Sequence, residues 1–396
     1  METITSTGPR ARMSDDGTTR AVAWLTAWDS QGIHRTATAG DEASAEWLIR
    51  ECAGLGVAPA VEGFILDRLD PIEAYLEYDG ARVSGVPLFD APATGDDGIA
   101  GILGPGGAET SIAVAELSPL SVYTPDYEGL RRNAVHCGLV IVCKGRQSGL
   151  GLLNAERFRH SYGAPAIHVS SEAGAEVLAA AARRVSARLV AASCRTPTRA
   201  CNVVVMIYGQ DRARAPVVVM TPRSSWWQST SERGGGLVCW LESLRAMVAS
   251  PPLCDVIFTA NSGHELGHLG LDDFMTRHPG WERPVAEGGA IWIHYGANIG
   301  AVEGELSIQS ANDDLRALAT AELTRAGRQP DRIAPKTLVP TGETRDIHRA
   351  GGCYVTLVGS NPLFHLPQDR WPHAVDASAV ARIAAAASRL VVRLTH

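Results

Sequence analysis

Two histidines flank a glutamate in His264-Glu265-Leu266-Gly267-His268, a spacing that can hold zinc. On a helix, histidines four residues apart share one face, and the glutamate between them can act as a general base. That arrangement needs a helix upstream of His264, yet residues 256–261 (VIFTAN) predict a strand. Gly267 also costs a helix about 1 kcal/mol. No third ligand follows at a recognised spacing, so we expect His264 and Glu265 to serve a different site.

Glu265 also has an interpretation without chemistry. Ser262 stands three residues before it, which is the spacing of a helix capping box. In that case both side chains only satisfy backbone N–H groups at a helix start.

The elements around these residues alternate regularly after residue 197. Strands are expected at 200–209, 215–222, 254–261, 290–296 and 352–359, and helices at 235–249, 264–278, 312–326 and 377–394. Such alternation predicts an α/β fold, a mostly parallel central sheet flanked by helices. Functional groups of such sheets lie at the carboxyl ends of the strands. The loops expected there carry Glu232, His264, Glu265, His294 and His365.

The rest of the chain divides into three further stretches. Residues 1–20 are polar and read as a tail, and residues 21–78 predict helices followed by a strand. Residues 79–193 contain short β-rich runs with many Gly and Pro, which indicates an inserted β-rich domain. We therefore expect the main domain to consist of residues 21–78 and 194–396.

Composition excludes several classes of function. The 396 residues carry a formal net charge of −7, which disfavours nucleic acid and anionic membranes as partners. No apolar run reaches the roughly 18 residues of a membrane helix, and no signal-peptide pattern opens the chain. The eight cysteines form no CxxC pair and read as reduced, buried thiols. We expect a cytoplasmic protein with a small-molecule or short-peptide substrate. Whether the chain forms a homodimer is left open by the sequence.

The order of the motifs resembles the zinc-dependent exopeptidases, a family that includes bacterial aminopeptidases, glutamate carboxypeptidase II, glutaminyl cyclase and the transferrin receptor. The stretches that carry the resemblance are IHRTATAGDEASAEWL, GGGLVCWLESLRAM, TANSGHELGHLG, GETRDIHRAGGCYVTL and SNPLFHLPQDRWPHAVD. Residues 79–193, with GLVIVCKG and APAIHVSSEAGAEVL, look like the protease-associated domain that several members carry. The resemblance covers nearly the whole chain.

The resemblance implies roles for individual positions, with departures. The family's first histidine ligand and nearby aspartate fall on Pro222 and Ser224, neither of which replaces them. The catalytic glutamate falls on His264, whose ordinary pKa near 6.5 suits a general base. The metal ligands implied by the resemblance are Glu232, Glu265, His294 and His365. One zinc ion is therefore expected more than two, because a catalytic zinc needs three protein ligands and an open position.

The loop before residue 236 offers three further readings. Arg223, Trp226 and Trp227 are candidates for substrate binding at the mouth of the site, or belong to a surface loop pinned by two tryptophans. Ser224 or Ser225 is a candidate nucleophile with His264 as base, although no Gly-x-Ser-x-Gly elbow is present. The glycines at 234–236 permit either an anion site at a helix start or a tight entry into the helix.

These observations favour a metal-dependent hydrolase acting on an amide or related bond of a small molecule or short peptide. Glu343 stands at a position where the resemblance implies an aspartate. We expect it to orient other site residues or to anchor a loop of the site. The alternatives are a non-catalytic binding or scaffold protein that keeps the peptidase fold, and a metal-free hydrolase or lyase.

Overall fold

The structure, a computed structural model, describes residues 10–132 and 135–396. Their helices are α1 Arg10–Asp29, α2 Ala39–Gly54, α3 Pro125–Arg132, α4 Ser171–Ala182, α5 Gly235–Ala249, α6 Leu269–Arg277, α7 Asp313–Arg325, α8 Thr344–Arg349 and α9 Ala377–Thr395. Their strands are β1 Ala60–Tyr78, β2 Ala81–Pro87, β3 Ile99–Gly104, β4 Ser111–Leu117, β5 Gly138–Cys143, β6 Ala166–Val169, β7 Ser186–Ile207, β8 Val217–Pro222, β9 Val256–Asn261, β10 Ile291–Tyr295, β11 Leu306–Gln309, β12 Arg332–Ile333 and β13 Cys353–Gly359.

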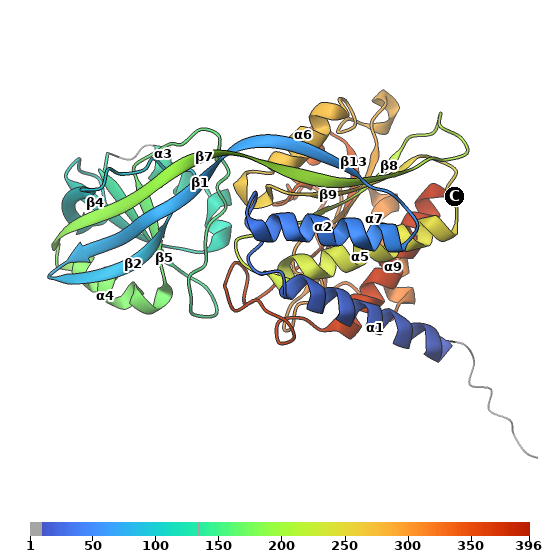
Figure 1. The fold of residues 1–396 in the computed structure, drawn as a ribbon, viewed down its shortest axis with the longest axis horizontal. Coiled ribbons are helices and arrows are strands. Elements are labelled where there is room, and N and C mark those ends of the chain that lie inside the picture. Colours follow the sequence, from blue (N-terminus) through green and yellow to red (C-terminus); the bar gives the residue numbers. More distant parts are fainter. Residues whose placement is uncertain (1–9, 133–134) are drawn as a thin grey trace, which may run out of the picture.

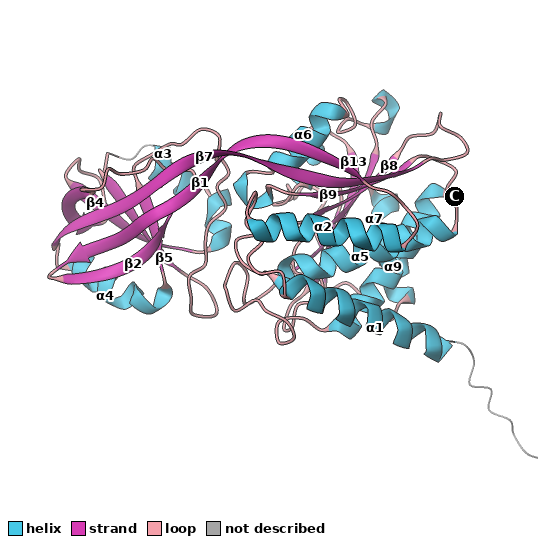
Figure 2. Ribbon diagram, in the orientation of Figure 1, coloured by secondary structure: helices cyan, strands magenta, loops and turns pink. Residues whose placement is uncertain are grey.

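Two lobes are joined by the long strands β1 and β7 (Figure 1). These strands pair antiparallel from Ala60↔Val204 to Tyr78↔Ala187, so one continuous ribbon belongs to both lobes. The smaller lobe contains β2–β6 with α3 and α4, and the larger lobe contains the other helices (Figure 2). The sequence placed domain boundaries at residues 78/79 and 193/194. These boundaries stay predictions, because β1 and β7 each run without a break through both lobes.

A mixed sheet organises the larger lobe, in the order β7-β9-β8-β10-β13-β11-β12. Strands β9, β8, β10 and β13 are parallel to one another, whereas β7 and β11 run antiparallel to their neighbours β9 and β13. The sequence prediction of an α/β fold, with a large central sheet and flanking helices, is confirmed in this form.

Alternating side chains of each strand fill two separate cores. Val217 and Val219 of β8 pack into the core that contains residues of α1, α2, α5, α7 and α9. Val218 and Met220 face the opposite side and pack with residues of α6 and with Ile347 of α8. Because both faces are covered, the strands are apolar at consecutive positions, which is the pattern seen in the sequence.

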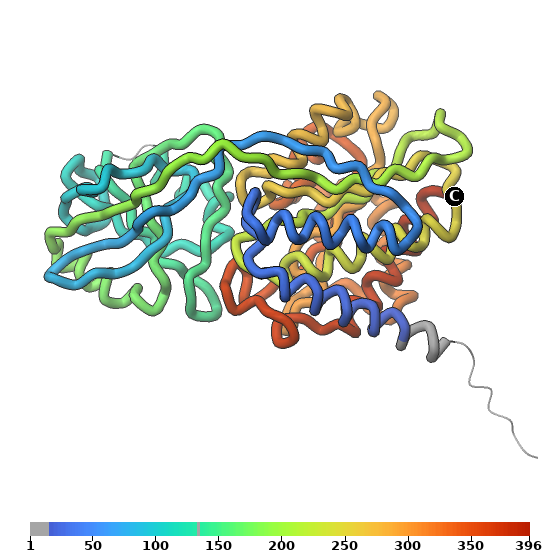
Figure 3. The backbone as a smooth tube through the Cα atoms, viewed as in Figure 1, coloured from blue at the N-terminus to red at the C-terminus, as the bar shows by residue number. Residues whose placement is uncertain are grey.

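The amino-terminal tail is shorter than predicted, because α1 already begins at Arg10. The apolar side of its second half anchors it: Leu25 and Trp28 are fully buried in the main core. Trp28 also stacks on His34 and donates to the carbonyl of Gln228. Residues 1–9 of the expected tail lie outside the described residues. The tube in Figure 3 shows α1 and α2 running along the same side of the larger lobe.

The glycines at 234–236 let α5 begin in close contact with neighbouring backbone. A Cβ on Gly235 would lie 1.9 Å from the carbonyl oxygen of Ile299, and one on Gly236 would lie 2.7 Å from Thr221 Oγ1. Tight entry into the helix is therefore the reason for this run, in preference to an anion site. Among the described helices, none is long and apolar enough to cross a membrane.

We predict that Gly235→Ala lowers the free energy of unfolding by about 2–3 kcal/mol, because the added methyl group meets rigid backbone. Gly54→Ala is the matched control, since a Cβ on Gly54 meets nothing within 4 Å in helix α2. That control should be neutral or stabilising by up to about 1 kcal/mol. Urea denaturation of both variants measures the difference, and equal stabilities would contradict the packing argument.

Candidate functional site

The carboxyl ends of the parallel strands hold a group of buried ionisable side chains. Strands β8 and β9 end side by side, with Pro222 paired to Asn261. The loops that follow β8, β9 and β13, the strand β10 and the start of α8 each contribute. We call this group the buried cluster; its members are Glu232, Arg233, His264, His268, His294, Glu343 and His365.

The backbone around Glu232 is held by a buried carboxylate. Asp369 accepts hydrogen bonds from the N–H groups of Ser231 (2.8 Å) and Glu232 (3.0 Å). Burial raises the pKa of Asp369 to about 7. The short π-helical turn Thr230–Gly234, which carries Glu232 into α5, is thus tied to the loop after β13.

Glu232 lies between a guanidinium and an imidazole. Arg233 Nη2 is 2.7 Å and His365 Nε2 is 3.4 Å from Glu232 Oε1. Burial opposes the charged form, but the positive charge of Arg233, followed by His365, lowers the pKa of Glu232 to about 2. His365 Nδ1 lies 2.6 Å from the carbonyl oxygen of Leu152 and donates to it.

A second part of the buried cluster centres on Glu343. His264 Nδ1 lies 3.5 Å from Glu343 Oε1, and His294 Nε2 lies 3.9 Å from Glu343 Oε2. Burial, with the charge of Arg233 second, lowers the pKa of His264 well below its ordinary value. Burial lowers the pKa of His294 to about 3 and raises that of Glu343 to about 7. His264 is thus neutral at pH 7, rather than titrating near 6.5 as its sequence suggests.

Most polar atoms of the buried cluster lack a hydrogen-bond partner. These atoms include both carboxylate oxygens of Glu232 and Glu343, both ring nitrogens of His268 and His294, and Arg233 Nη1. Buried polar groups are nearly always paired, and each exception asks for a functional or structural reason. The concentration of such atoms at the strand ends marks this place as the candidate site.

Glu265 is not available as a ligand, contrary to the sequence prediction. Its Oε1 accepts hydrogen bonds from the N–H and hydroxyl groups of Thr36, and its Oε2 accepts one from the Ser224 hydroxyl. Burial raises the pKa of Glu265. The capping-box interpretation is also wrong, because the Ser262 hydroxyl donates to Asp41. Glu265 instead fastens the loop after β9 to the amino-terminal segment.

The serine-nucleophile alternative is not supported either. The Ser224 hydroxyl donates to Glu265 and accepts from the backbone N–H groups of Gly263 and His264. The Ser225 hydroxyl donates to the carbonyl of Trp227. Neither hydroxyl contacts an imidazole. The zincin pattern is excluded as well, since α6 begins at Leu269, after both histidines.

The residues present do not fit the zinc ion expected from the sequence. Of the four predicted ligands, Glu232 and His365 come together, whereas Glu265 is saturated and His294 faces Glu343. Across residues 10–132 and 135–396, no three His, Cys, Asp or Glu side chains are arranged to hold a metal ion.

Charge is the second obstacle to an ion. The guanidinium of Arg233 carries a positive charge and already contacts Glu232. At an effective dielectric constant near 20, a cation about 4 Å from the guanidinium is opposed by about 4 kcal/mol per unit of charge.

The three predicted substrate-binding residues have structural partners. Arg223 is fully buried in an ion pair with Asp41 (2.8 Å) and also donates to the carbonyl of Cys201. Trp226 packs on Phe89 and donates to Asn154. Trp227 is half-buried, and its ring nitrogen donates to the carbonyl of His365. The loop pinned by two tryptophans is therefore the better description, because the guanidinium of Arg223 is already engaged by Asp41 and Cys201.

One segment of the smaller lobe closes over the buried cluster. Besides the contact of Leu152 with His365, the N–H of Ala155 donates to the carbonyl of Glu265 at 2.8 Å. Glu156 forms an ion pair with Arg345 of α8 at 2.8 Å. The segment 152–156 thus lies against two loops and helix α8 of the larger lobe.

Sequence reasoning missed two members of the buried cluster. Arg233 directly follows Glu232, but an arginine beside an expected metal ligand carried no motif signal. His268 was not among the candidate site residues, yet it is buried, with its ring centroid 4.9 Å from that of His264. The strand-end rule could have included His268, because the loop after β9 continues until Leu269.

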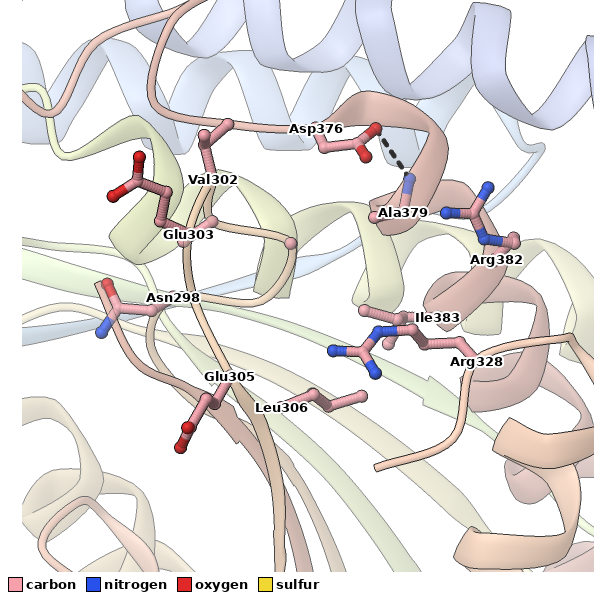
Figure 4. Close-up of a pocket in the computed structure, with 13 residues that line it drawn as sticks. Asn298, Val302, Glu303, Glu305, Leu306, Arg328, Asp376, Ala379, Arg382 and Ile383 are labelled. Atoms are coloured by element: carbon pink, nitrogen blue, oxygen red, sulfur yellow. Dashed lines mark hydrogen bonds between the residues drawn. The ribbon is translucent and has the colours of Figure 1, made fainter. Parts of the chain in front are cut away.

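A separate pocket lies beside α9, with a volume of about 320 Å³ (Figure 4). Arg328 and Arg382 line one side of it, and Glu303 and Glu305 line the other. Arg328 is paired with Asp331, and Asp376 caps the start of α9. The pocket thus consists mainly of groups that already have partners, and it is not part of the candidate site.

Comparison with solved structures identifies the fold. A zinc aminopeptidase from Bacillus subtilis superposes with a TM-score of 0.75 at 17% identity, covering 93% of each chain. An aminopeptidase from Aneurinibacillus sp. strain AM-1 gives 0.71 at 14% identity, covering 96% of this chain and 93% of that one. A peptidase M28 precursor from Shewanella amazonensis SB2B gives 0.74 at 15% identity, covering 97% and 96%. The fold is that of these aminopeptidases.

Neither protein-family models nor curated proteins match this chain. At such low identities, the likeness supports the architecture that the motifs predicted. It does not transfer the metal or the activity.

We predict that Glu343→Gln flattens the pH dependence of stability. Because the folded pKa of Glu343 is raised from 4.5 to about 7, wild-type stability from this group is full below pH 4.5 and is lost as pH rises toward 7. Asp369 contributes in the same direction, so part of the slope should remain. Melting temperatures between pH 4.5 and 8 test this, and an unchanged slope in the variant would count against a buried, neutral Glu343.

We also predict that Ser224→Ala lowers the free energy of unfolding by about 2–3 kcal/mol, since it leaves Glu265 Oε2 and the N–H of His264 without a partner, while the N–H of Gly263 keeps Thr36 as its acceptor. Ser225→Ala is the matched control, because the Trp227 carbonyl still accepts from the N–H of His34. Its expected loss is about 1 kcal/mol or less. Chemical denaturation distinguishes the two, and a reversed order would show that Glu265 does not anchor the loop.

Proposed function

We propose that this chain is a hydrolase that cleaves an amide or related bond in a small molecule or short peptide. The observation that carries the proposal is the buried cluster, whose ionisable side chains keep unpaired polar atoms at the strand ends. The aminopeptidase fold of the solved neighbours supports the same class of reaction. Their zinc ion is not carried over, because the donor set of this chain does not fit it.

His264 is the base in this proposal. Its Nδ1 faces Glu343, which leaves Nε2 as the nitrogen that accepts a proton from water. It is also 7% exposed, the most accessible imidazole of the buried cluster. The water oxygen attacks the carbonyl carbon, and the proton held on His264 passes to the nitrogen as the carbon–nitrogen bond breaks. Glu343 Oε1 lies 3.5 Å from Nδ1, and its ionised form, which becomes populated as pH rises through its pKa of about 7, stabilises the protonated ring.

We further propose that the smaller lobe is a protease-associated type of insert that limits substrate size. The contacts of segment 152–156 with His365, Glu265 and Arg345 support this role. A site closed in this way favours a small molecule or a chain end over an internal peptide segment. The eight free cysteines, of which Cys194 is exposed, support a reducing, cytoplasmic location.

The first alternative is a binding protein that keeps the peptidase fold. The depth of the buried cluster and the saturation of Glu265 favour it, because turnover needs water and substrate to reach His264. Ligand binding without turnover would identify this alternative.

The proposal is tested by incubating the purified chain with aminoacyl p-nitroanilides, dipeptides and N-acyl amino acids and following products by mass spectrometry. For a compound that is cleaved, His264→Ala and Glu343→Gln should each lower kcat/KM by about 10²–10³-fold. His160→Ala replaces an exposed histidine of the smaller lobe and should leave turnover unchanged. Absence of turnover across the panel, with or without added divalent ions, would overturn the proposal.

A further inference from the structure

The position of Arg233 conflicts with a metal ion at Glu232 and His365. These two residues are the predicted ligands that do converge, and the guanidinium contacts the same carboxylate oxygen that faces His365. Arg233 is 1% exposed, and its Nε donates to the carbonyl of Ser224 at 2.7 Å. The guanidinium is therefore fixed in place from both sides and cannot move away to admit an ion without losing buried partners.

We propose that the Arg233 guanidinium supplies the positive charge of this site, in the place where the fold's zinc-dependent relatives use metal. Its Nη1 is buried without a hydrogen-bond partner, and its charge acts on both His264 and Glu343. An N–H group in this state can donate to an anionic oxygen, such as a substrate carboxylate or the oxygen that becomes negative during hydrolysis. The catalytic part of this inference rests on the proposed function, whereas the absence of a zinc requirement does not.

Zinc binding is the decisive measurement, and it needs no activity. The full chain is titrated with zinc against a chelating dye, and its metal content is measured after dialysis. Wild type should retain far less than one zinc per chain. Arg233→Gln removes the charge but keeps a polar side chain, and it should bind zinc at least about tenfold more tightly. Arg233→Lys keeps the charge and should not gain zinc.

Two further variants localise the effect. Adding His365→Gln to Arg233→Gln should abolish the gained zinc, which places the ion between Glu232 and His365. If wild type instead binds one zinc per chain and loses it on His365→Gln, the inference is overturned. Circular dichroism shows whether Arg233→Gln folds. If it does not fold, the zinc measurement on the wild type alone still tests the inference. A lack of turnover in every substrate assay would contradict the proposed hydrolase function. It would not affect the result of the zinc measurement.

Discussion

The buried ion pair between Glu232 and Arg233 constrains the rest of the site. Two charges removed from water are tolerated only when their remaining polar atoms are paired or held in good geometry. Here Asp369 fixes the backbone of Glu232, Ser224 accepts from Arg233, and the close-packed glycines set the start of α5. These restraints come from the connection between β8 and α5 and from the loop after β13, so the pair depends on both segments being in place.

Glu265 performs the complementary task on the other side of that edge. Its two oxygens collect donors from Thr36 and Ser224, and Ser224 in turn accepts from the loop after β9. Three segments far apart in sequence are thereby joined through one buried carboxylate. The motif suggested a chemical role for Glu265, but in the structure its hydrogen bonds hold the loop that carries His264.

Local patterns were enough to predict the architecture of the larger lobe. Apolar runs such as residues 217–221 and 256–260 are typical of strands covered on both faces, and the alternation with helices implies their parallel order. The extent of α1 and the continuity of β1 with β7 were not predictable in this way. Trp28 is buried by contacts with residues about 200 positions away, and β1 pairs with β7 in a distant part of the same chain. Local sequence encodes neither contact.

The site was predicted only as a neighbourhood. The strand-end rule placed Glu232, His264, Glu265, His294 and His365 at the same edge of the sheet, because it depends on topology alone. It could not decide which side chains face each other, since that depends on hydroxyl and guanidinium partners with no fixed spacing. Thr36 is separated from its partner Glu265 by 229 positions in the sequence. Arg233 directly follows the carboxylate that it neutralises, and this neighbourhood carries no motif signal.

The exchange of an ion for a guanidinium has a physical consequence beyond charge. A zinc ion accepts electron pairs and draws several donors into a fixed shell, whereas arginine only donates and leaves neighbouring imidazoles unbound. Burial and the nearby positive charge lower the pKa values of His264 and His294, which disfavours a proton on either ring. Such a site keeps proton acceptors ready beside a fixed cation, which is an arrangement suited to water activation without a metal.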